Sequence, residues 1–505
     1  MAALVLAGTL FLSPGVYAAK KPTDVVAVEV VGLIQQGKDA LDADKSADAL
    51  KLLEKAIATP GFGDTESAIQ YFAYLLGSFA AVGTGDNAKA HDFLVAASRF
   101  PDADAEVWTR RAQSEVLLGK PEDAAQSLMT VARKWPKDLK GDEYHNWLVN
   151  KTVRDLGKQP SLQKTRSDLV NTLFDAGYQT LYGREPSHLW LMAATDAIDR
   201  KDPKRAKEVT RRITNSSTLV AMRIDKRFDA LTSSEPTLFD VQAAAGREVI
   251  QAQKAMKENP KSLGAIVVFG YALYTVGQFE EMLALSDSII AKVDKAKGKE
   301  PLYEDIDEQL NWIYNHKASA LRALGRFDEA AAVLQSWNDN QRNAGDKVSQ
   351  AINLGFFYNE MGRPDDALKA VAGIDASKGM SEYGRTQYEF VRFQAFEQQK
   401  KTSEAEAIVA WMREHKDDSL ETAQDTLMEA GDVDGAAALM ISRLNDPDER
   451  SNALAGIQRY AQSPRTERLK ELDGLSEALL ARPDVVAAIA QYGRRETFPI
   501  YSMEF

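Results

Sequence analysis

The chain has 505 residues, 44% of them hydrophobic and 27% charged, which is enough for about two to four domains or one long repeat array. It contains no cysteine, and this excludes disulfides, thiolate nucleophiles, iron–sulfur clusters and cysteine-based zinc sites. With 62 basic and 74 acidic side chains the formal net charge is −12, which disfavours general binding to nucleic acid but leaves room for a local basic patch.

Residues 1–18 have the features of a secretory signal peptide. Residues 2–12 form an apolar run, and Val16 and Ala18 occupy the two positions that a signal peptidase reads. No Lys or Arg precedes this run, and the alternative is a first buried helix of the mature fold. The run is shorter than the roughly 20 residues of a membrane span. We therefore expect an exported chain, periplasmic or secreted, without an integral membrane anchor.

After the signal segment the apolar residues recur with the period of an α-helix, and a glycine-containing turn motif recurs between the predicted helices. A glycine suits the left-handed end of one helix, and the acids that follow suit the positive start of the next. A small residue then lets the two helices approach closely. The motif occurs at residues 119–124, 277–282, 325–330, 362–367 and 431–436.

The spacing of the motif indicates true repeats. Gly325 and Gly362 are 37 residues apart, and Gly362 and Gly431 are 69 apart, close to two units of about 34. The skipped unit lies around Lys400 to Met412, where the spacing of the second helix persists without the glycine. Self-similarity at this period is typical of stacked helical hairpins.

These residues resemble tetratricopeptide-repeat (TPR) proteins, in which large and small residues alternate along two helices of a hairpin. The resemblance implies an all-α fold, an α-solenoid of stacked antiparallel helical hairpins that forms a TPR-like superhelix in one or two arrays. The residues assigned to the repeat core are Trp108, Gly119, Ala124, Gly277, Gly325, Ala330, Gly355, Tyr358, Gly362, Ala367, Gly431 and Ala436.

The expected organisation has four parts. After the signal peptide at 1–18, a degenerate N-terminal helical-repeat array covers 19–231, and a break follows at 232–236. A C-terminal TPR-like array covers 237–450, and capping helices with an aromatic tail cover 451–505. From Phe498 onward, apolar and polar residues alternate. This pattern indicates either a strand that pairs with a partner protein or a cap that folds back on the last helices.

No motif for catalysis is present. The five His residues are scattered without an HExxH pair, and the sequence lacks a nucleophile elbow, a phosphate-binding loop and a dinucleotide fingerprint. Pairs of acids occur mainly where helix starts and charged loops are expected. We therefore expect no cofactor, no metal site and no enzyme activity.

One basic cluster stands out between Arg200 and Arg227, where ten basic residues and three acids give a local balance of +7. Lys204, Lys207 and Arg211 would share a helical face, which could bind an acidic polymer, a membrane surface or an acidic partner. The alternative is a solvated helix surface, and the scarcity of aromatics argues against nucleic acid. The candidate patch consists of Arg200, Lys204, Arg205, Lys207, Arg211 and Arg212.

The first helices of the repeats carry no lysine at the positions where some TPR domains hold a terminal carboxylate. Their apolar and aromatic residues suggest a groove for extended or helical apolar segments, and the alternative is that some of them belong to the core. These positions are Thr109, Gln113, Val267, Tyr271, Asn315, Ser319, Ile352 and Phe356.

The resemblance implies a non-catalytic protein-interaction scaffold or assembly factor of the cell envelope, with protein partners bound in the concave face. The alternative is a carbohydrate-binding or glycan-processing all-α protein, in which Trp190, Trp312 or Trp411 would be a stacking platform.

Overall fold

The computed structural model describes residues 22–139, 141–296, 301–339, 347–375 and 380–503. Over these residues the chain forms 26 α-helices and five short 3-10 helices, with isolated bridges as its only extended pairing. The expected all-α fold of stacked helical hairpins is thereby confirmed. The predicted signal peptide at 1–18 lies outside the described residues. The chain divides into two compact units between Pro186 and Ser187.

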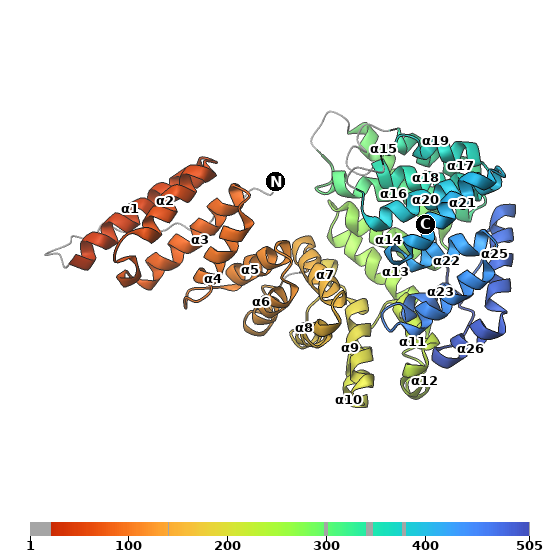
Figure 1. The fold of residues 1–505 in the computed structure, drawn as a ribbon, viewed down its shortest axis with the longest axis horizontal. Coiled ribbons are helices and arrows are strands. Elements are labelled where there is room, and N and C mark those ends of the chain that lie inside the picture. The colour runs from red at the N-terminus through yellow and green to blue at the C-terminus, as the bar shows by residue number, and fades with distance from the viewer. Residues whose placement is uncertain (1–21, 140, 297–300, 340–346, 376–379, 504–505) are drawn as a thin grey trace. The chain divides into compact units, whose positions relative to one another are not determined.

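The first unit contains consecutive helical hairpins, in which each helix packs on the next (Figure 1). Ala73 and Ala80 on one helix and Ala90 and Ala97 on the next are fully buried, so small residues let the two helices approach closely. The helices of unit 1 are α1 (Pro22–Asp42), α2 (Ser46–Ala58), α3 (Ser67–Gly83), α4 (Asn87–Ala97), α5 (Ala105–Leu117), α6 (Pro121–Lys134), α7 (Glu143–Gly157) and α8 (Gln163–Asp175).

The second unit continues the same arrangement with more helices. It contains α9 (Ser187–Asp199), α10 (Pro203–Thr210), α11 (Ser216–Ile224), α12 (Asp229–Ser234), α13 (Val241–Glu258), α14 (Leu263–Thr275), α15 (Phe279–Lys295), α16 (Ile306–Ala323) and α17 (Phe327–Asn338). It continues with α18 (Lys347–Glu360), α19 (Pro364–Val371), α20 (Glu382–Gln398), α21 (Thr402–Glu414), α22 (Leu420–Glu429), α23 (Val433–Asn445), α24 (Arg450–Gly456), α25 (Glu467–Leu480) and α26 (Pro483–Tyr492). The predicted array boundary at 232–236 lies inside this unit, at the end of α12.

Tight turns join the two helices of each hairpin. After α16, Gly325 has φ +74°, and the amides of Gly325 and Arg326 donate to the carbonyls of Arg322 and Leu321 at 2.9 and 2.8 Å. This pairing satisfies carbonyls that the helix end leaves without partners. The same left-handed conformation occurs at Gly85, Gly119, Gly277, Gly362 and Gly431.

The skipped unit is also a hairpin, made of α20 and α21. Its turn residue is Lys400, which has φ +59°, and the Lys401 amide donates to the Phe396 carbonyl at 2.9 Å. A lysine therefore takes the conformation that glycine provides in many other hairpins, at a cost of about 1 kcal/mol, and Asp44 and Lys201 do the same after α1 and α9.

Much of unit 2 closes on itself, because its last residues contact α11 and α12, which follow the α9–α10 hairpin. The Arg494 amide donates to the Ile224 carbonyl at 2.9 Å, and the Arg223 guanidinium pairs with Glu496 at 2.6 Å. Helix α11 also packs against α24. The C-terminal segments therefore connect α11 with the end of the array within this unit.

Close helix packing at Gly355 is a sensitive point of the core. A Cβ at Gly355 of α18 would lie 2.7 Å from a methyl of Val391 on α20 and 3.2 Å from Val371 on α19. By contrast, Gly246 in the middle of α13 has no atom within 4 Å of a Cβ position among the described residues.

Gly355→Ala should therefore lower the free energy of unfolding by about 1–3 kcal/mol, because the added methyl overpacks a full interface. The matched control, Gly246→Ala, should leave stability unchanged or raise it by up to about 1 kcal/mol, since alanine favours a helix interior. Urea unfolding followed by circular dichroism measures both. Equal stabilities for the two variants would contradict this packing.

Candidate functional site

Two C-terminal segments pair side by side in unit 2. We call residues 457–466 the linker and residues 493–503 the tail. The Arg459 amide donates to the Glu496 carbonyl at 3.0 Å, and the Phe498 amide donates to the Arg459 carbonyl at 2.8 Å. Phe498 and Ile500 are buried, which explains the alternation seen in the sequence. The tail thus folds back onto its own chain and pairs with the linker.

The linker and tail cover one edge of the array, where the first helices of the hairpins end. The Tyr501 amide donates to the Thr275 carbonyl at the end of α14 at 2.9 Å. Pro464 lies against Gly325 after α16, and the Thr466 hydroxyl donates to the Glu360 carbonyl at the end of α18 at 2.6 Å. These contacts show that helix ends of this array can bind an extended chain.

Tyr501 fills a socket in this edge. Its ring packs edge-to-face on Phe279 with 4.8 Å between centroids. A Cβ at Gly277 would lie only 2.6 Å from the same ring, so glycine is required there for space as well as for its φ of +78°. The predicted repeat-core residue Gly277 therefore also shapes the tail's binding site.

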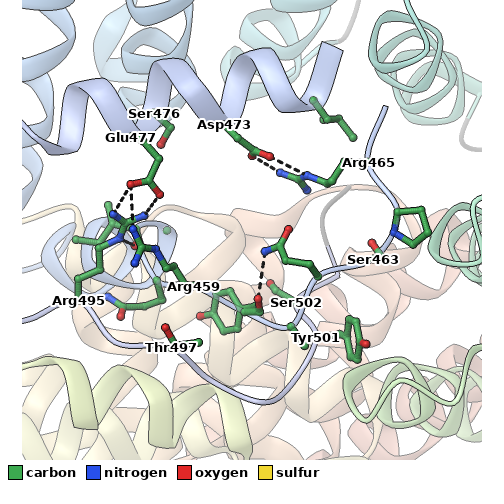
Figure 2. Close-up of a pocket in the computed structure, with 18 of the residues that line it drawn as sticks. Arg459, Ser463, Arg465, Asp473, Ser476, Glu477, Arg495, Thr497, Tyr501 and Ser502 are labelled. Atoms are coloured by element: carbon green, nitrogen blue, oxygen red, sulfur yellow. Dashed lines mark hydrogen bonds and ion pairs between the residues drawn. The ribbon is translucent and has the colours of Figure 1, made fainter. Parts of the chain in front are cut away.

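A cavity of about 590 Å³ lies between α25 and the paired linker and tail. Its volume is in the range of ligand-binding clefts. Tyr274 and Arg322 contribute from the array, whereas the other lining residues belong to the C-terminal segments and α25. Figure 2 shows the acidic side chains of α25 facing arginines of the linker and tail across this cleft.

Ion pairs span the cleft at two points of α25. Arg495 donates to both carboxylate oxygens of Glu477, at 2.5 and 2.8 Å, and Arg459 donates at 3.2 Å. One turn earlier, Asp473 accepts two hydrogen bonds from Arg465, one of them at 3.1 Å. Hydrogen bonds from Arg495, then from Arg459, lower the pKa of Glu477 to about 2, so this carboxylate is ionised at neutral pH.

The repeat-core residues predicted from the sequence lie at the hairpin turns and interfaces. Ala124, Ala330, Ala367 and Ala436 have no exposed surface, and Tyr358 is 7% exposed. Trp108 is half-buried, with the guanidinium of Arg111 over its ring. The alanines, Tyr358 and Trp108 position the site by packing the helices and do not line the cavity, whereas Gly277 and Gly325 lie against the tail and the linker.

The expected groove positions lie mostly in the core. Five of the eight are buried, and among the apolar and aromatic ones Val267 and Ile352 belong to the core, which is the alternative to a groove at those positions. The first helices of neighbouring hairpins pack together there, as the contact of Tyr271 with His316 shows (ring centroids 4.6 Å apart). Asn315, Ser319 and Phe356 border only a small cavity of about 40 Å³. The buried positions are Thr109, Val267, Asn315, Ser319 and Ile352.

The basic patch lies around α10, and acids of the same unit neutralise much of it. Lys204 is exposed, and the Arg212 guanidinium lies 4.9 Å from the centre of the Trp190 ring. The pairs are Arg200–Asp196 (2.6 Å), Arg205–Glu208 (3.1 Å), Lys207–Glu235 and Arg211–Glu235 (3.5 Å).

The tryptophans considered as sugar platforms are placed differently from one another. Trp190 is completely buried, which rules it out as a platform. Trp411 is half-buried and stacks on His415 with 4.1 Å between ring centroids. Trp312 is 36% exposed on α16. None of the three lines the large cavity.

In unit 1 the first helices of the hairpins also end in left-handed glycine turns, but no described segment packs on the turns at Gly85 and Gly119. No described atom lies within 4 Å of a Cβ position at Gly85 or Gly119, in contrast to Gly277 and Gly325 in unit 2, although Gly362 and Gly431 of unit 2 are open in the same way. Beside these turns, Val82 and Leu117 are 58% and 54% exposed. We call Val82, Gly85, Leu117 and Gly119 the open edge.

A titratable group that the sequence did not single out is Asp425 on α22. Burial raises the pKa of Asp425 to about 7, and Glu421 and Glu429 on the same helix raise it further than Arg443 lowers it. It lies outside the lining of the large cavity, so we assign it to stability rather than to binding.

Comparison with known proteins identifies no relative by sequence. No family model and no curated protein matches the chain. Matching solved structures include the TPR domain of P58(IPK) (14% identity, 90% of this chain and 99% of that chain, TM-score 0.22), yeast Tom70 (14%, 92% and 99%, 0.27) and human IFIT1 (12%, 92% and 96%, 0.31). At these TM-scores the likeness carries no information on what this chain binds. The hairpin architecture stands on the contacts among its own helices.

None of the helices in the described ranges is both long and apolar enough to cross a membrane. The same residues contain no cluster of three side chains suited to a metal ion.

Tyr501→Ala should loosen the tail, because it removes the ring that fills the socket at Gly277. We expect the amides of residues 496–501 to exchange with deuterium about tenfold faster, which corresponds to about 1.4 kcal/mol of lost local stability. Tyr383→Ala, at a tyrosine that is 59% exposed on α20, is the control and should leave the tail unchanged. Unchanged exchange in Tyr501→Ala would show that the ring does not hold the tail.

Asp425→Asn should stabilise the chain at high pH. The folded state holds the Asp425 proton up to about pH 7, whereas the unfolded state releases it near the usual aspartate pKa of 3.8, so stability falls as pH rises between these values. The gain should be about 1–3 kcal/mol at pH 8 and should shrink toward pH 5. Thermal unfolding at both pH values measures it. The exposed Glu414→Gln is the charge-matched control, and an equal gain there would refute the assignment.

Proposed function

We propose that the chain is an exported, non-catalytic interaction protein that binds an extended segment of a partner protein on its helical hairpins. The observation that carries this proposal is the bound tail of unit 2. There, helix-end carbonyls accept hydrogen bonds from Tyr501 and Thr466, and the Tyr501 ring occupies a socket formed by a turn. An array that holds its own extended segment in this way has the chemistry to hold another.

The open edge of unit 1 is the surface that we assign to the partner. It offers the same left-handed turns, and its two apolar side chains, Val82 and Leu117, are more than half exposed. Burying them under an apolar or aromatic residue of the partner would release about 25 cal/mol for each Å² of apolar surface removed from water. We therefore expect a partner segment that is extended and carries an aromatic residue, as the tail carries Tyr501.

The export part of the proposal rests on the leader expected at residues 1–18. The non-catalytic part rests on the sequence, which carries none of the motifs that acyl transfer, phosphoryl transfer or zinc hydrolysis requires.

Cross-linking of the chain of residues 19–505 in a cell-envelope fraction, followed by mass spectrometry, tests the assignment. Val82→Glu with Leu117→Glu should reduce capture of the partner at least about tenfold, because two charges would enter an apolar contact. The control is Ile250→Glu with Val348→Glu, at side chains that are 70% and 43% exposed in unit 2. It should leave the capture intact. A partner that both double variants capture equally would show that the open edge is not the binding surface.

A further inference from the structure

The large cavity of unit 2 has one wall with three arginines. Arg459 and Arg465 come from the linker and Arg495 from the tail, and all three point toward α25 (Figure 2). Guanidinium groups that meet carboxylates with two parallel hydrogen bonds give strong and geometrically specific pairing. Arg495 makes such a fork with Glu477, and Arg465 makes one with Asp473.

Part of this arginine wall is held in place by contacts other than those with α25. The Arg495 Nε donates to the Ile457 carbonyl at 2.7 Å, so its guanidinium is fixed by the linker backbone. The linker–tail pairing and the buried side chains of Phe498 and Ile500 fix the backbone that carries Arg459 and Arg495. Arg495 would therefore keep its place if the carboxylates of α25 moved away.

The middle of helix α25, in contrast, has little buried surface over the cleft. Of its fourteen residues only Leu469, Leu479 and Leu480 are buried, and they lie near its two ends. The side chains of Asp473 and Glu477 between them are 46% and 48% exposed, so a competing carboxylate can reach the arginines that they contact. The attachments of the helix lie at its ends, where Arg468 pairs with Glu429 at 2.7 Å and Arg482, just after the helix, pairs with Asp434 at 2.7 Å.

We propose that the arginine wall is a binding site for an acidic, amphipathic helical segment of a partner protein, and that α25 occupies this site in the absence of the partner. Asp473 and Glu477 are four residues apart on one face of α25, and Leu469 and Leu480 also line the cavity. The occupant therefore displays the pattern that the site recognises: two carboxylates one helical turn apart, flanked by leucines. This surface is separate from the open edge and goes beyond the function proposed above.

A labelled synthetic peptide with the sequence of residues 467–480 is the probe, and fluorescence anisotropy with the full chain measures its binding. The double variant Asp473→Asn with Glu477→Gln, made in the full chain, removes the ion pairs between the arginines and α25. The peptide should therefore bind this variant about tenfold more tightly than it binds the unaltered chain. The charge-matched control, Glu467→Gln with Glu471→Gln, changes exposed acids that do not line the cavity and should not alter the affinity.

Two further measurements identify the site. Adding Arg459→Ala and Arg495→Ala to the chain that carries Asp473→Asn and Glu477→Gln should abolish peptide binding. A peptide with Asn and Gln in place of the two acids should not bind. In the unaltered chain, excess peptide should speed deuterium exchange in residues 473–480. This result does not depend on the variants folding.

Binding that is indifferent to the arginines, or unchanged exchange in α25 at saturating peptide, would overturn the proposal. Inorganic polyphosphate is the competing probe. If it binds as tightly as the peptide, the wall recognises anions in general and the assignment to a protein segment is wrong. Loss of partner capture through the open edge would not affect any of these results, so the two proposals fail separately.

Discussion

The backbone carbonyls at the ends of the first helices are the constraint on which the rest of this structure depends. Each α-helix leaves its last carbonyls without an intrahelical partner, and a hairpin repeat places these ends in a row. A left-handed turn residue satisfies part of them through the amides that follow, as at Gly325. The others accept hydrogen bonds from another segment, as Thr275 and Glu360 do from the C-terminal segments. The same requirement thus shapes the hairpins and creates an edge that binds extended chains.

Much of the fold could be predicted from local chemistry. Glycine indicates a turn because few other residues adopt positive φ without cost, as at Gly119, Gly325, Gly362 and Gly431. The buried alanines that follow these glycines indicate close contacts between helices. The signal is weaker where the chain uses Lys400 for the same turn, since only the spacing of the next helix reveals that hairpin. A strong repeat pattern therefore predicts the architecture even where single repeats lack the expected residue.

The candidate sites were much less predictable. Whether Asn315 or Ile352 faces a groove or the core depends on how tightly neighbouring hairpins wind, and no single repeat encodes this. The cleft joins Arg322 of the array to Arg495 of the tail, which are far apart in sequence and belong to no common motif. The linker and tail are irregular, so hydrophobic periodicity gives no signal beyond the alternation at Phe498 and Ile500. The basic cluster near α10 gave a clear sequence signal, yet acids such as Glu235 pair with it in the fold.

The return of the tail to Ile224 and of Glu496 to Arg223 changes how unit 2 should lose its structure. In an open repeat array each hairpin is stabilised by its nearest neighbours, so unfolding starts at a terminal repeat and propagates inward. Here the last segment is bonded to α11, so the helices from α11 onward have no free terminal repeat, and only the α9–α10 hairpin precedes the closure. Unfolding of this part must first break the closure, which couples distant hairpins into one cooperative block. Proteases and chaperones would meet the part of unit 2 from α11 onward either intact or entirely unfolded, with few intermediate states between the two.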